Sequence, residues 1–280
     1  MRLYDAHNHL QDDRFGGRTA DLLSACDREG VVRMVVNGAC EADWPQVLAL
    51  ARRHPQVLAS FGLHPWYVGE RTPDWQARLV QFLDQVPGAV GEIGLDRWKP
   101  GLAYAGQEEV FLWQFRLAHE RNLPASIHCL QAWGRLHDLL RQLPRLRRGF
   151  LLHSYGGPRE MVPALAQLGA YFSFPGYYAH ERKARQREAF RHVPPERLLI
   201  ETDAPDQSLP ETFNAHPLRD PATGQAINHP ANVGAVYRFV AEMLGEPRDS
   251  LAARVEENFE RLFGPRLSGV PPRKLFLGDP

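Results

Sequence analysis

Short segments of β-branched or other apolar residues alternate along this chain with longer segments whose apolar residues recur at three- and four-residue spacing. This alternation is typical of strand–helix units on a parallel sheet, because the crossover between two parallel strands needs a helix-length connection. Eight segments have the composition of strands: residues 2–6, 31–37, 57–62, 89–94, 125–129, 149–153, 170–174 and 197–202. Eight such units predict an α/β fold of the (β/α)8 TIM-barrel type.

The remaining segments indicate how the chain is divided. Helical spacing is clearest in residues 20–29, 75–86, 107–121 and 132–142 and, after a long loop at residues 204–229, in residues 231–244 and 250–263. A chain of 280 residues with 44% hydrophobic residues is long enough for one barrel and contains no low-complexity linker. We therefore expect a single barrel domain over residues 1–265 and an irregular tail over residues 266–280.

Charge and cysteine content limit the classes of function. The 33 basic and 33 acidic residues cancel, so no global positive field attracts nucleic acid, and a nucleic-acid substrate must be held locally. The three cysteines are odd in number and far apart, which favours free thiols in a reducing compartment. Neither a signal-like N-terminus nor an apolar run of about 18 residues occurs, so we expect a cytoplasmic protein without a membrane partner.

Residues able to bind a metal ion lie at or near the ends of most predicted strands. In chain order they are His7, His9, Glu92, His128, His153 and Asp203. The carboxyl ends of the strands of a parallel barrel share one rim, so these side chains are expected to converge. Imidazole and carboxylate groups bind zinc, manganese and related ions, and a carboxylate also bridges two ions. The pattern predicts a metal site at the mouth of the barrel.

Each of these residues taken alone has a structural alternative. A single histidine at a strand end, such as His128 or His153, is commonly a hydrogen-bonded core residue, and Asp203 is suited to capping the segment that follows. Glu92 is harder to explain in this way, because a buried carboxylate in an apolar strand is costly unless it is paired or bound to a metal. The joint pattern of four histidines and two acids favours the metal site.

Eight short motifs occur in the chain: DAHNHL at residues 5–10, GLHP at 62–65, GEIGLD at 91–96, PASIH at 124–128, HSYGG at 153–157, ETDAP at 201–205, HPAN at 229–232 and NFERLF at 258–263. Together, in this order, they resemble the TatD-type metal-dependent hydrolases, which include TatD-type deoxyribonucleases and belong to the amidohydrolase-like superfamily. The resemblance spans nearly the whole chain. It implies one ion held by His7, His9 and Asp203, a second held by His128 and His153, and Glu92 as the bridge.

The resemblance also concerns the substrate pocket. It places His64 beside the metals, in the pocket rather than among the ligands. Trp66 and Tyr155 follow strand ends and are candidates to stack nucleobases on the rim, with packing of loops under the barrel mouth as the alternative.

One position departs from the pattern of the family. Many members carry a basic residue directly after the histidine of the fifth strand, whereas Cys129 stands there in this chain. Arg97 and Lys99, after GEIGLD, are candidates to supply the missing positive charge to a phosphate, with a solvated loop as the alternative.

A pair of divalent cations, with zinc, manganese and magnesium as the candidates, suits hydrolysis by a metal-activated water. We therefore expect a phosphodiesterase similar to a 3'–5' exodeoxyribonuclease, in which Glu92 and Asp203 are catalytic and Asp203 takes or positions the proton of the water. The expected substrate is DNA, single-stranded or at an end, or a small phosphodiester or ester. An esterase or amidase, such as a D-aminoacyl-tRNA deacylase, is one alternative, and a metal-stabilised binding protein is another. The sequence leaves the oligomeric state open.

Overall fold

The computed structural model describes residues 1–264, and the irregular tail expected for residues 266–280 lies outside the described residues. Eight parallel strands form one sheet in chain order. They are β1 Leu3–Asn8, β2 Val31–Asn37, β3 Val57–Phe61, β4 Gly88–Asp96, β5 Ala125–Leu130, β6 Phe150–Leu152, β7 Ala170–Pro175 and β8 Leu198–Glu201. Every predicted strand is present.

Backbone hydrogen bonds join the last strand to the first. The Asp203 N–H, just beyond β8, donates to the carbonyl of His7 at 2.9 Å, and the His9 N–H donates to the carbonyl of Ala204 at 2.8 Å. Between the same two strands, the buried carboxylate of Asp5 accepts hydrogen bonds from the hydroxyl of Thr202 at 2.6 Å and from the backbone N–H of Thr202 at 3.0 Å. These bonds close the sheet into the predicted (β/α)8 barrel.

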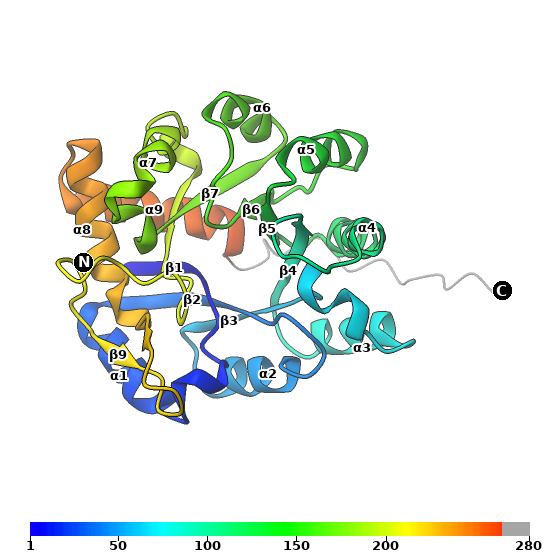
Figure 1. Ribbon diagram of the computed structural model, residues 1–280, viewed down its shortest axis with the longest axis horizontal. Helices are drawn as coiled ribbons and strands as arrows, with labels where there is room; N and C mark the ends of the chain where they lie inside the picture. The colour runs from blue at the N-terminus through cyan, green and yellow to red at the C-terminus, as the bar shows by residue number, and fades with distance from the viewer. Residues whose placement is uncertain (265–280) are drawn as a thin grey trace.

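Helices surround the barrel in chain order (Figure 1). They are α1 Thr19–Glu29, α2 Trp44–Arg53, α3 Trp75–Leu83, α4 Tyr104–Arg121, α5 Trp133–Gln142, α6 Val162–Gln167, α7 Ala184–Phe190, α8 Val233–Leu244 and α9 Arg248–Phe263. The helices expected from spacing are confirmed. Helices α6 and α7 span 6 and 7 residues, too few turns for a clear periodicity. No helix within residues 1–264 combines the length and the apolarity of a membrane span.

The last helix supports the amino-terminal ends of the strands. The side-chain amide of Asn258, in α9, donates to the carbonyls of Pro195 and Leu198 at 2.8 and 2.9 Å. Phe259 packs on Tyr4 of β1 with ring centroids 4.8 Å apart. Because α9 holds this end of β1 and β8 in place, the opposite end of the barrel remains open for a site.

The long loop after β8 contains a two-stranded antiparallel hairpin, β9 Leu218–Arg219 and β10 Ala226–Ile227. It leads to a single turn of 3-10 helix, Pro230–Asn232, before α8. The side chain of Asn228 donates to the carbonyl of Thr202 at 2.8 Å, which ties this loop to the carboxyl end of β8. The loop therefore borders the mouth of the barrel.

Candidate metal centre

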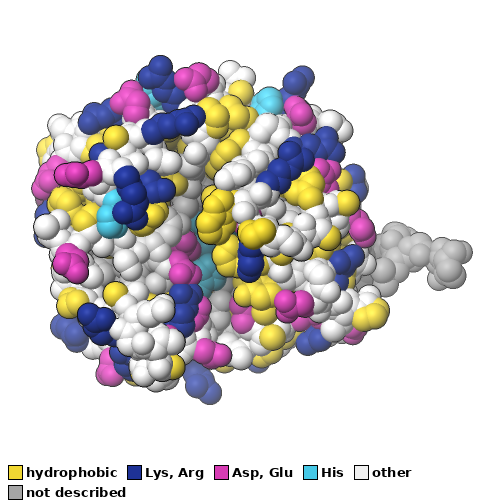
Figure 2. Space-filling model, in the orientation of Figure 1, with side chains coloured by type: hydrophobic (Ala, Val, Ile, Leu, Met, Phe, Trp, Pro, Cys, Tyr) yellow, Lys and Arg dark blue, Asp and Glu magenta, His cyan; other side chains and the backbone are white. Residues whose placement is uncertain are grey.

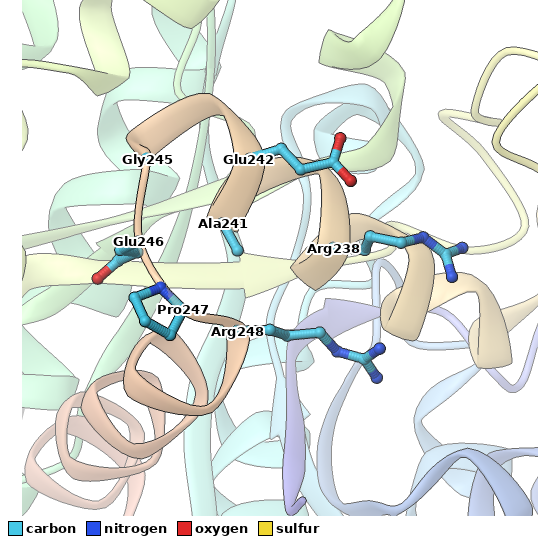
Figure 3. A pocket seen from close by; sticks show the side chains of 7 residues that line it. All are labelled: Arg238, Ala241, Glu242, Gly245, Glu246, Pro247 and Arg248. Carbon is cyan, nitrogen blue, oxygen red and sulfur yellow. The ribbon is translucent and has the colours of Figure 1, made fainter.

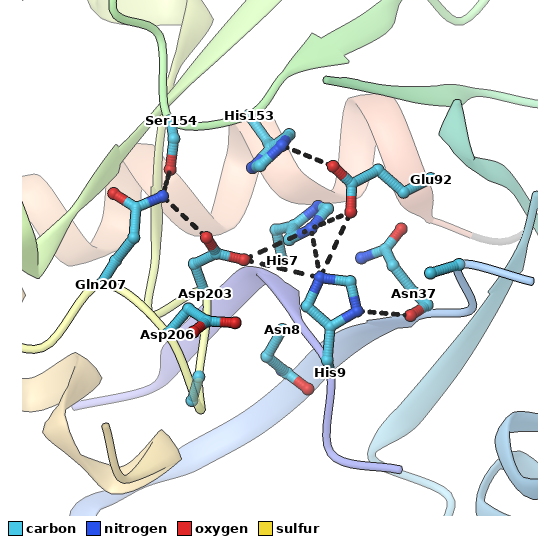
Figure 4. A network of polar contacts seen from close by, with 12 residues as sticks. His7, Asn8, His9, Asn37, Glu92, His153, Ser154, Asp203, Asp206 and Gln207 are labelled. Carbon is cyan, nitrogen blue, oxygen red and sulfur yellow. Dashed lines mark hydrogen bonds and ion pairs between the residues drawn. The ribbon is translucent and has the colours of Figure 1, made fainter. Parts of the chain in front are cut away.

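Imidazole and carboxylate groups from six strands converge at the mouth of the barrel. Figure 4 shows those of His7, His9, Glu92, His153 and Asp203. The cluster contains all six predicted ligands and His64: His7, His9, His64, Glu92, His128, His153 and Asp203. All are buried except His9, which is partly exposed. In the space-filling view the same face is hollowed near its middle, with histidine at the floor and hydrophobic side chains along one border (Figure 2).

Glu92 lies at the centre of the cluster, and its two oxygens face different groups. Its Oε2 is 3.3 Å from Nε2 of His7 and 3.2 Å from Nε2 of His9. The nearer oxygen of Asp203, Oδ1, lies 3.6 Å from the same two nitrogens. His7, His9, Asp203 and Oε2 of Glu92 therefore form one donor set.

The other oxygen of Glu92, Oε1, faces a second set of imidazoles. It is 3.1 Å from Nδ1 of His128 and 2.8 Å from Nε2 of His153. Nε2 of His64 lies 3.3 Å from the same oxygen. One carboxylate thus separates two groups of nitrogen donors, an arrangement suited to a bridging ligand.

Hydrogen bonds on the far side of the rings fix the positions of two imidazole protons. Nδ1 of His9 faces the carbonyl of Asn37 at 2.8 Å, so this nitrogen carries the proton and a neutral His9 has a lone pair on Nε2. Nε2 of His128 donates to the carboxylate of Asp96 at 3.1 Å, which leaves the lone pair of His128 on Nδ1. Both lone pairs point at Glu92, and such contacts are repulsive unless a proton or a cation lies between the atoms.

This donor set fits divalent cations. Ligating histidines usually donate their second N–H to a carbonyl or carboxylate, as His9 and His128 do. Four donors about 2.1 Å from a tetrahedral ion stand about 3.4 Å apart. The nitrogens of His7 and His9 are 3.3 Å apart, and those of His128 and His153 are also 3.3 Å apart.

His64 differs from the other imidazoles in the position of its proton. The Trp66 N–H donates to Nδ1 of His64 at 3.2 Å, so the proton of a neutral His64 is on Nε2, directed at Glu92. Burial lowers the pKa of His64 to about 4, which keeps the ring neutral. Nε2 of His64 therefore donates to Glu92, and His64, Glu92 and His128 also form a group whose ligand atoms lie within 4.8 Å of one another, close enough to hold a metal ion.

Asp203 is held by a residue that the sequence analysis did not name. The amide of Gln207 donates to Oδ2 of Asp203 at 2.7 Å and also contacts the hydroxyl of Ser154, so Oδ1 is the oxygen that faces the cluster. Asp203 has a left-handed backbone conformation, with φ of 53°. Burial raises the pKa of its carboxyl to about 7.

Two further buried acids, Asp96 and Glu201, lie beside the histidines, and Asp96 orients His128 through a hydrogen bond. Burial opposes ionisation of Asp96, but hydrogen bonds from His128 and Trp66 outweigh it and hold the pKa of that carboxyl below its usual value. Glu201, in β8, accepts hydrogen bonds from the hydroxyls of Ser154 and Ser173, and its Oε1 lies 3.8 Å from Nδ1 of His153. The sequence offered the same signal for Glu201 as for Glu92, an acid in an apolar strand.

The residues predicted to bind substrate occupy different kinds of position. Trp66 is partly exposed beside the cluster, and its indole N–H donates to Asp96 at 2.6 Å. Arg97 is exposed, with its guanidinium 4.0 Å from the ring centroid of Tyr104. Tyr155, expected on the rim, is instead fully buried, and its hydroxyl donates to the carbonyl of Pro158 at 2.7 Å.

The burial of Tyr155 has a packing cause. Its ring lies edge-on to Trp133 and Phe172, with centroids 4.7 and 5.0 Å away. This position leaves neither face of the Tyr155 ring open to a nucleobase. Cys129 is also buried, and burial raises the pKa of its thiol, so it supplies no charge in place of the basic residue.

A second hollow lies at the turn between α8 and α9 (Figure 3). The charged side chains that line it are two arginines and two glutamates: Arg238, Glu242, Glu246 and Arg248. Helix α8 begins beside the mouth and is 12 residues long, so its other end is about 18 Å away. This hollow therefore takes no part in the metal centre.

A (β/α)8 barrel with imidazole and carboxylate groups gathered at its mouth is typical of metal-dependent barrel hydrolases. The sequence model of the family described as TatD related DNase matches residues 4–264. The chain belongs to this family.

Two relatives and one solved structure illustrate the similarity. The chain is 30% identical over 268 residues to "3'-5' ssDNA/RNA exonuclease TatD" of Escherichia fergusonii, covering 94% of this chain and 99% of the relative. It is 28% identical over 265 residues to "Uncharacterized metal-dependent hydrolase YjjV" of Escherichia coli K12, covering 94% and 98%. The crystal structure of the TatD homologue YjjV from E. coli K12 matches with a TM-score of 0.84 at 27% identity, covering 94% of this chain and 98% of that one.

Proposed function

We propose that this protein is a two-metal phosphodiesterase that removes nucleotides from an end of single-stranded nucleic acid. The observation that carries the proposal is the position of Glu92, whose two oxygens each face a separate set of imidazole nitrogens. Membership of the TatD related DNase family and similarity to a relative named as a 3'-5' ssDNA/RNA exonuclease support the choice of bond and substrate.

The residues present define which groups would hold the two ions. His7, His9 and Asp203 would hold one, His128 and His153 the other, and Glu92 would bridge them. Sets dominated by imidazole favour zinc or manganese over magnesium, which prefers oxygen ligands. When bound, such ions acidify water and counter the negative charge that develops during phosphodiester hydrolysis.

The chain itself supplies proton transfer and orientation. Asp203 takes or positions the proton of the attacking water, and Gln207 fixes the orientation of its carboxylate through Oδ2. His64 donates from Nε2 to Glu92 and keeps that carboxylate in its bridging orientation. Removing the Asp203 carboxylate, by Asp203→Asn, is expected to abolish most turnover while the fold is retained.

The buried, uncharged Cys129 favours a second candidate, an ester or amide hydrolase such as a D-aminoacyl-tRNA deacylase. Such an enzyme needs less positive charge beside the metals than an enzyme that binds a phosphodiester. The same metal pair supports both reactions on this fold.

The test compares Glu92→Gln with Glu109→Gln, a change at an exposed position of α4. Metal content is measured first, and then hydrolysis of single-stranded DNA, RNA, a phosphodiester reporter, a carboxyl ester and D-aminoacyl-tRNA. We expect about two equivalents of metal and phosphodiester hydrolysis in the wild type and in Glu109→Gln, and a loss of at least roughly 100-fold in Glu92→Gln. Hydrolysis of the ester or of D-aminoacyl-tRNA alone would establish the second candidate instead.

A further inference from the structure

The loop that follows β4 is tied directly to the metal centre through Asp96. Oδ2 of Asp96 accepts from Nε2 of His128 at 3.1 Å and from the indole of Trp66 at 2.6 Å. Its other oxygen accepts from the backbone N–H groups of Trp98 and Lys99 at 2.7 and 3.0 Å. The carboxylate that orients a candidate ligand therefore also fixes the backbone of this loop at the mouth.

Trp98 stands out on this loop because its large apolar side chain is exposed to solvent. It is 59% exposed, and within residues 1–264 the other large hydrophobic residue that is exposed is the N-terminal Met1. Its backbone is held by the hydrogen bond to Asp96, so the indole is presented from a fixed position. An exposed tryptophan on a fixed loop beside a reactive centre is suited to stack on a planar ligand.

Cations flank Trp98 on both sides, and each lies against an aromatic ring. The ammonium of Lys99 is 4.0 Å from the ring centroid of Trp66, and the guanidinium of Arg97 is 4.0 Å from that of Tyr104. Within residues 1–264 neither cation lies within 4.0 Å of a carboxylate oxygen, although the charge of Arg97 contributes to lowering the pKa of Glu108, whose own ion pair is with Arg135. Both therefore keep their charge available for an anionic ligand.

The opposite border of the mouth has a different character. There Arg14 is bound to two carboxylates, Asp12 and Asp206, each at 2.8 Å. Its positive charge is neutralised, and an extra negative charge remains. Of these two borders, the β4 loop attracts a phosphate backbone, because its cations are not neutralised in this way.

Alternation of exposed aromatic rings with unpaired cations is the arrangement that binds single-stranded nucleic acid, in which bases stack and phosphates pair with the cations. We propose that residues Arg97, Trp98 and Lys99 form a nucleotide-binding platform, in which Trp98 stacks on a nucleobase and Arg97 and Lys99 bind the adjacent phosphates. This proposal rests on the proposed function and names the surface by which a strand is held for cleavage.

The experiment separates stacking from charge by using two probes. Fluorescence anisotropy measures binding of the metal-free protein to fluorescein-labelled dT10 and to a decamer with the same phosphate backbone but no bases. Trp98→Ala is expected to weaken binding of dT10 roughly 10-fold and to leave binding of the baseless decamer unchanged. Trp98→Phe, which keeps a ring, is expected to restore most of the affinity for dT10.

The contribution of charge is tested with a matched pair of arginines. Arg97 and Arg197 each lie on a tyrosine ring, but Arg197 precedes β8, at the closed end of the barrel. Arg97→Ala is expected to weaken binding of both probes several-fold, whereas Arg197→Ala is expected to leave both unchanged.

Equal affinity of wild type and Trp98→Ala for dT10, or equal affinity of the wild type for dT10 and the baseless decamer, would overturn the platform. Hydrolysis of the phosphodiester reporter by the wild type is measured in parallel. If the wild type does not hydrolyse the reporter, the proposed function is wrong. If it hydrolyses the reporter but binds dT10 no more tightly than the baseless decamer, only the platform is wrong.

Discussion

The histidines at the mouth differ in which ring nitrogen carries the proton, and therefore in whether a lone pair or a proton faces Glu92. His9 and His128 donate to Asn37 and Asp96 on the far side, so each directs a lone pair at the cluster. His64 accepts on its far side and directs a proton inward. Residue type alone does not distinguish ligands from neighbours, because imidazole serves in either role.

A substitution of Asp96 tests whether the hydrogen bond on the far side of His128 affects metal binding. Asp96→Asn keeps an oxygen acceptor for His128 but removes the negative charge that makes its imidazole a stronger ligand. We expect the affinity for zinc to fall about 10- to 100-fold, measured by competition with a chelating dye. Asp249→Asn, at an exposed position in the first turn of α9, is the control. Equal zinc affinity in the two variants would remove Asp96 from the metal centre.

Among the helices and strands, the two ends of the barrel differ in function: one end carries the candidate site and the other is held by α9. The carboxyl ends of the strands carry the histidines and acids, and α9 holds the amino-terminal ends of β1 and β8 in place. The loop after β8 connects the two ends of the barrel, because it borders the mouth and then leads into α8, which is followed by α9.

Asn258 tests the contribution of α9 to stability. Asn258→Ala leaves the carbonyls of Pro195 and Leu198 without their side-chain donor in a buried position. We expect a loss of about 1–3 kcal/mol in the free energy of unfolding, measured by urea denaturation. Glu257→Ala, at the neighbouring exposed position, removes only a surface ion pair with Arg261 and is expected to cost less than about 1 kcal/mol. Similar losses in both variants would contradict the role given to Asn258.

His229 gives the start of α8 a pH dependence. Its Nδ1 accepts from the Ala231 N–H at 3.0 Å, and burial lowers its pKa from 6.5 to about 4. The unfolded chain therefore binds this proton more readily than the folded chain, so stability is lost as the pH falls from about 6.5 towards 4.

The variant His229→Asn keeps an acceptor for the Ala231 N–H but does not titrate. We expect the free energy of unfolding of the wild type to fall by on the order of 2 kcal/mol more than that of the variant between pH 7 and pH 4. Urea denaturation at several pH values measures the difference. Parallel profiles would show that His229 does not titrate in this range.

For the whole molecule, the balance of charge determines how a polyanion is bound. The 33 basic and 33 acidic residues give no net charge, so attraction to nucleic acid depends on local groups such as Arg97 and Lys99. Each phosphate neutralised on a single strand contributes about −0.7 to the slope of log affinity against log salt.

Two cations therefore predict a slope of about −1.4 for binding of dT10. The measurement is anisotropy over a series of salt concentrations, with Arg97→Ala expected to reduce the slope by about half. A wild-type slope steeper than about −4 would indicate a diffuse basic surface in place of the platform.

The barrel and the six candidate ligands could be predicted from the sequence. Both follow from local patterns: the alternation of strand and helix spacing, and polar residues such as Glu92 and His128 at strand ends, which a parallel barrel must bring to one rim. The ring nitrogen of each histidine that faces Glu92, the burial of Tyr155 and the exposure of Trp98 become apparent in the folded molecule. Those properties depend on hydrogen-bond partners and packing neighbours that are distant in the chain, and no local pattern specifies them.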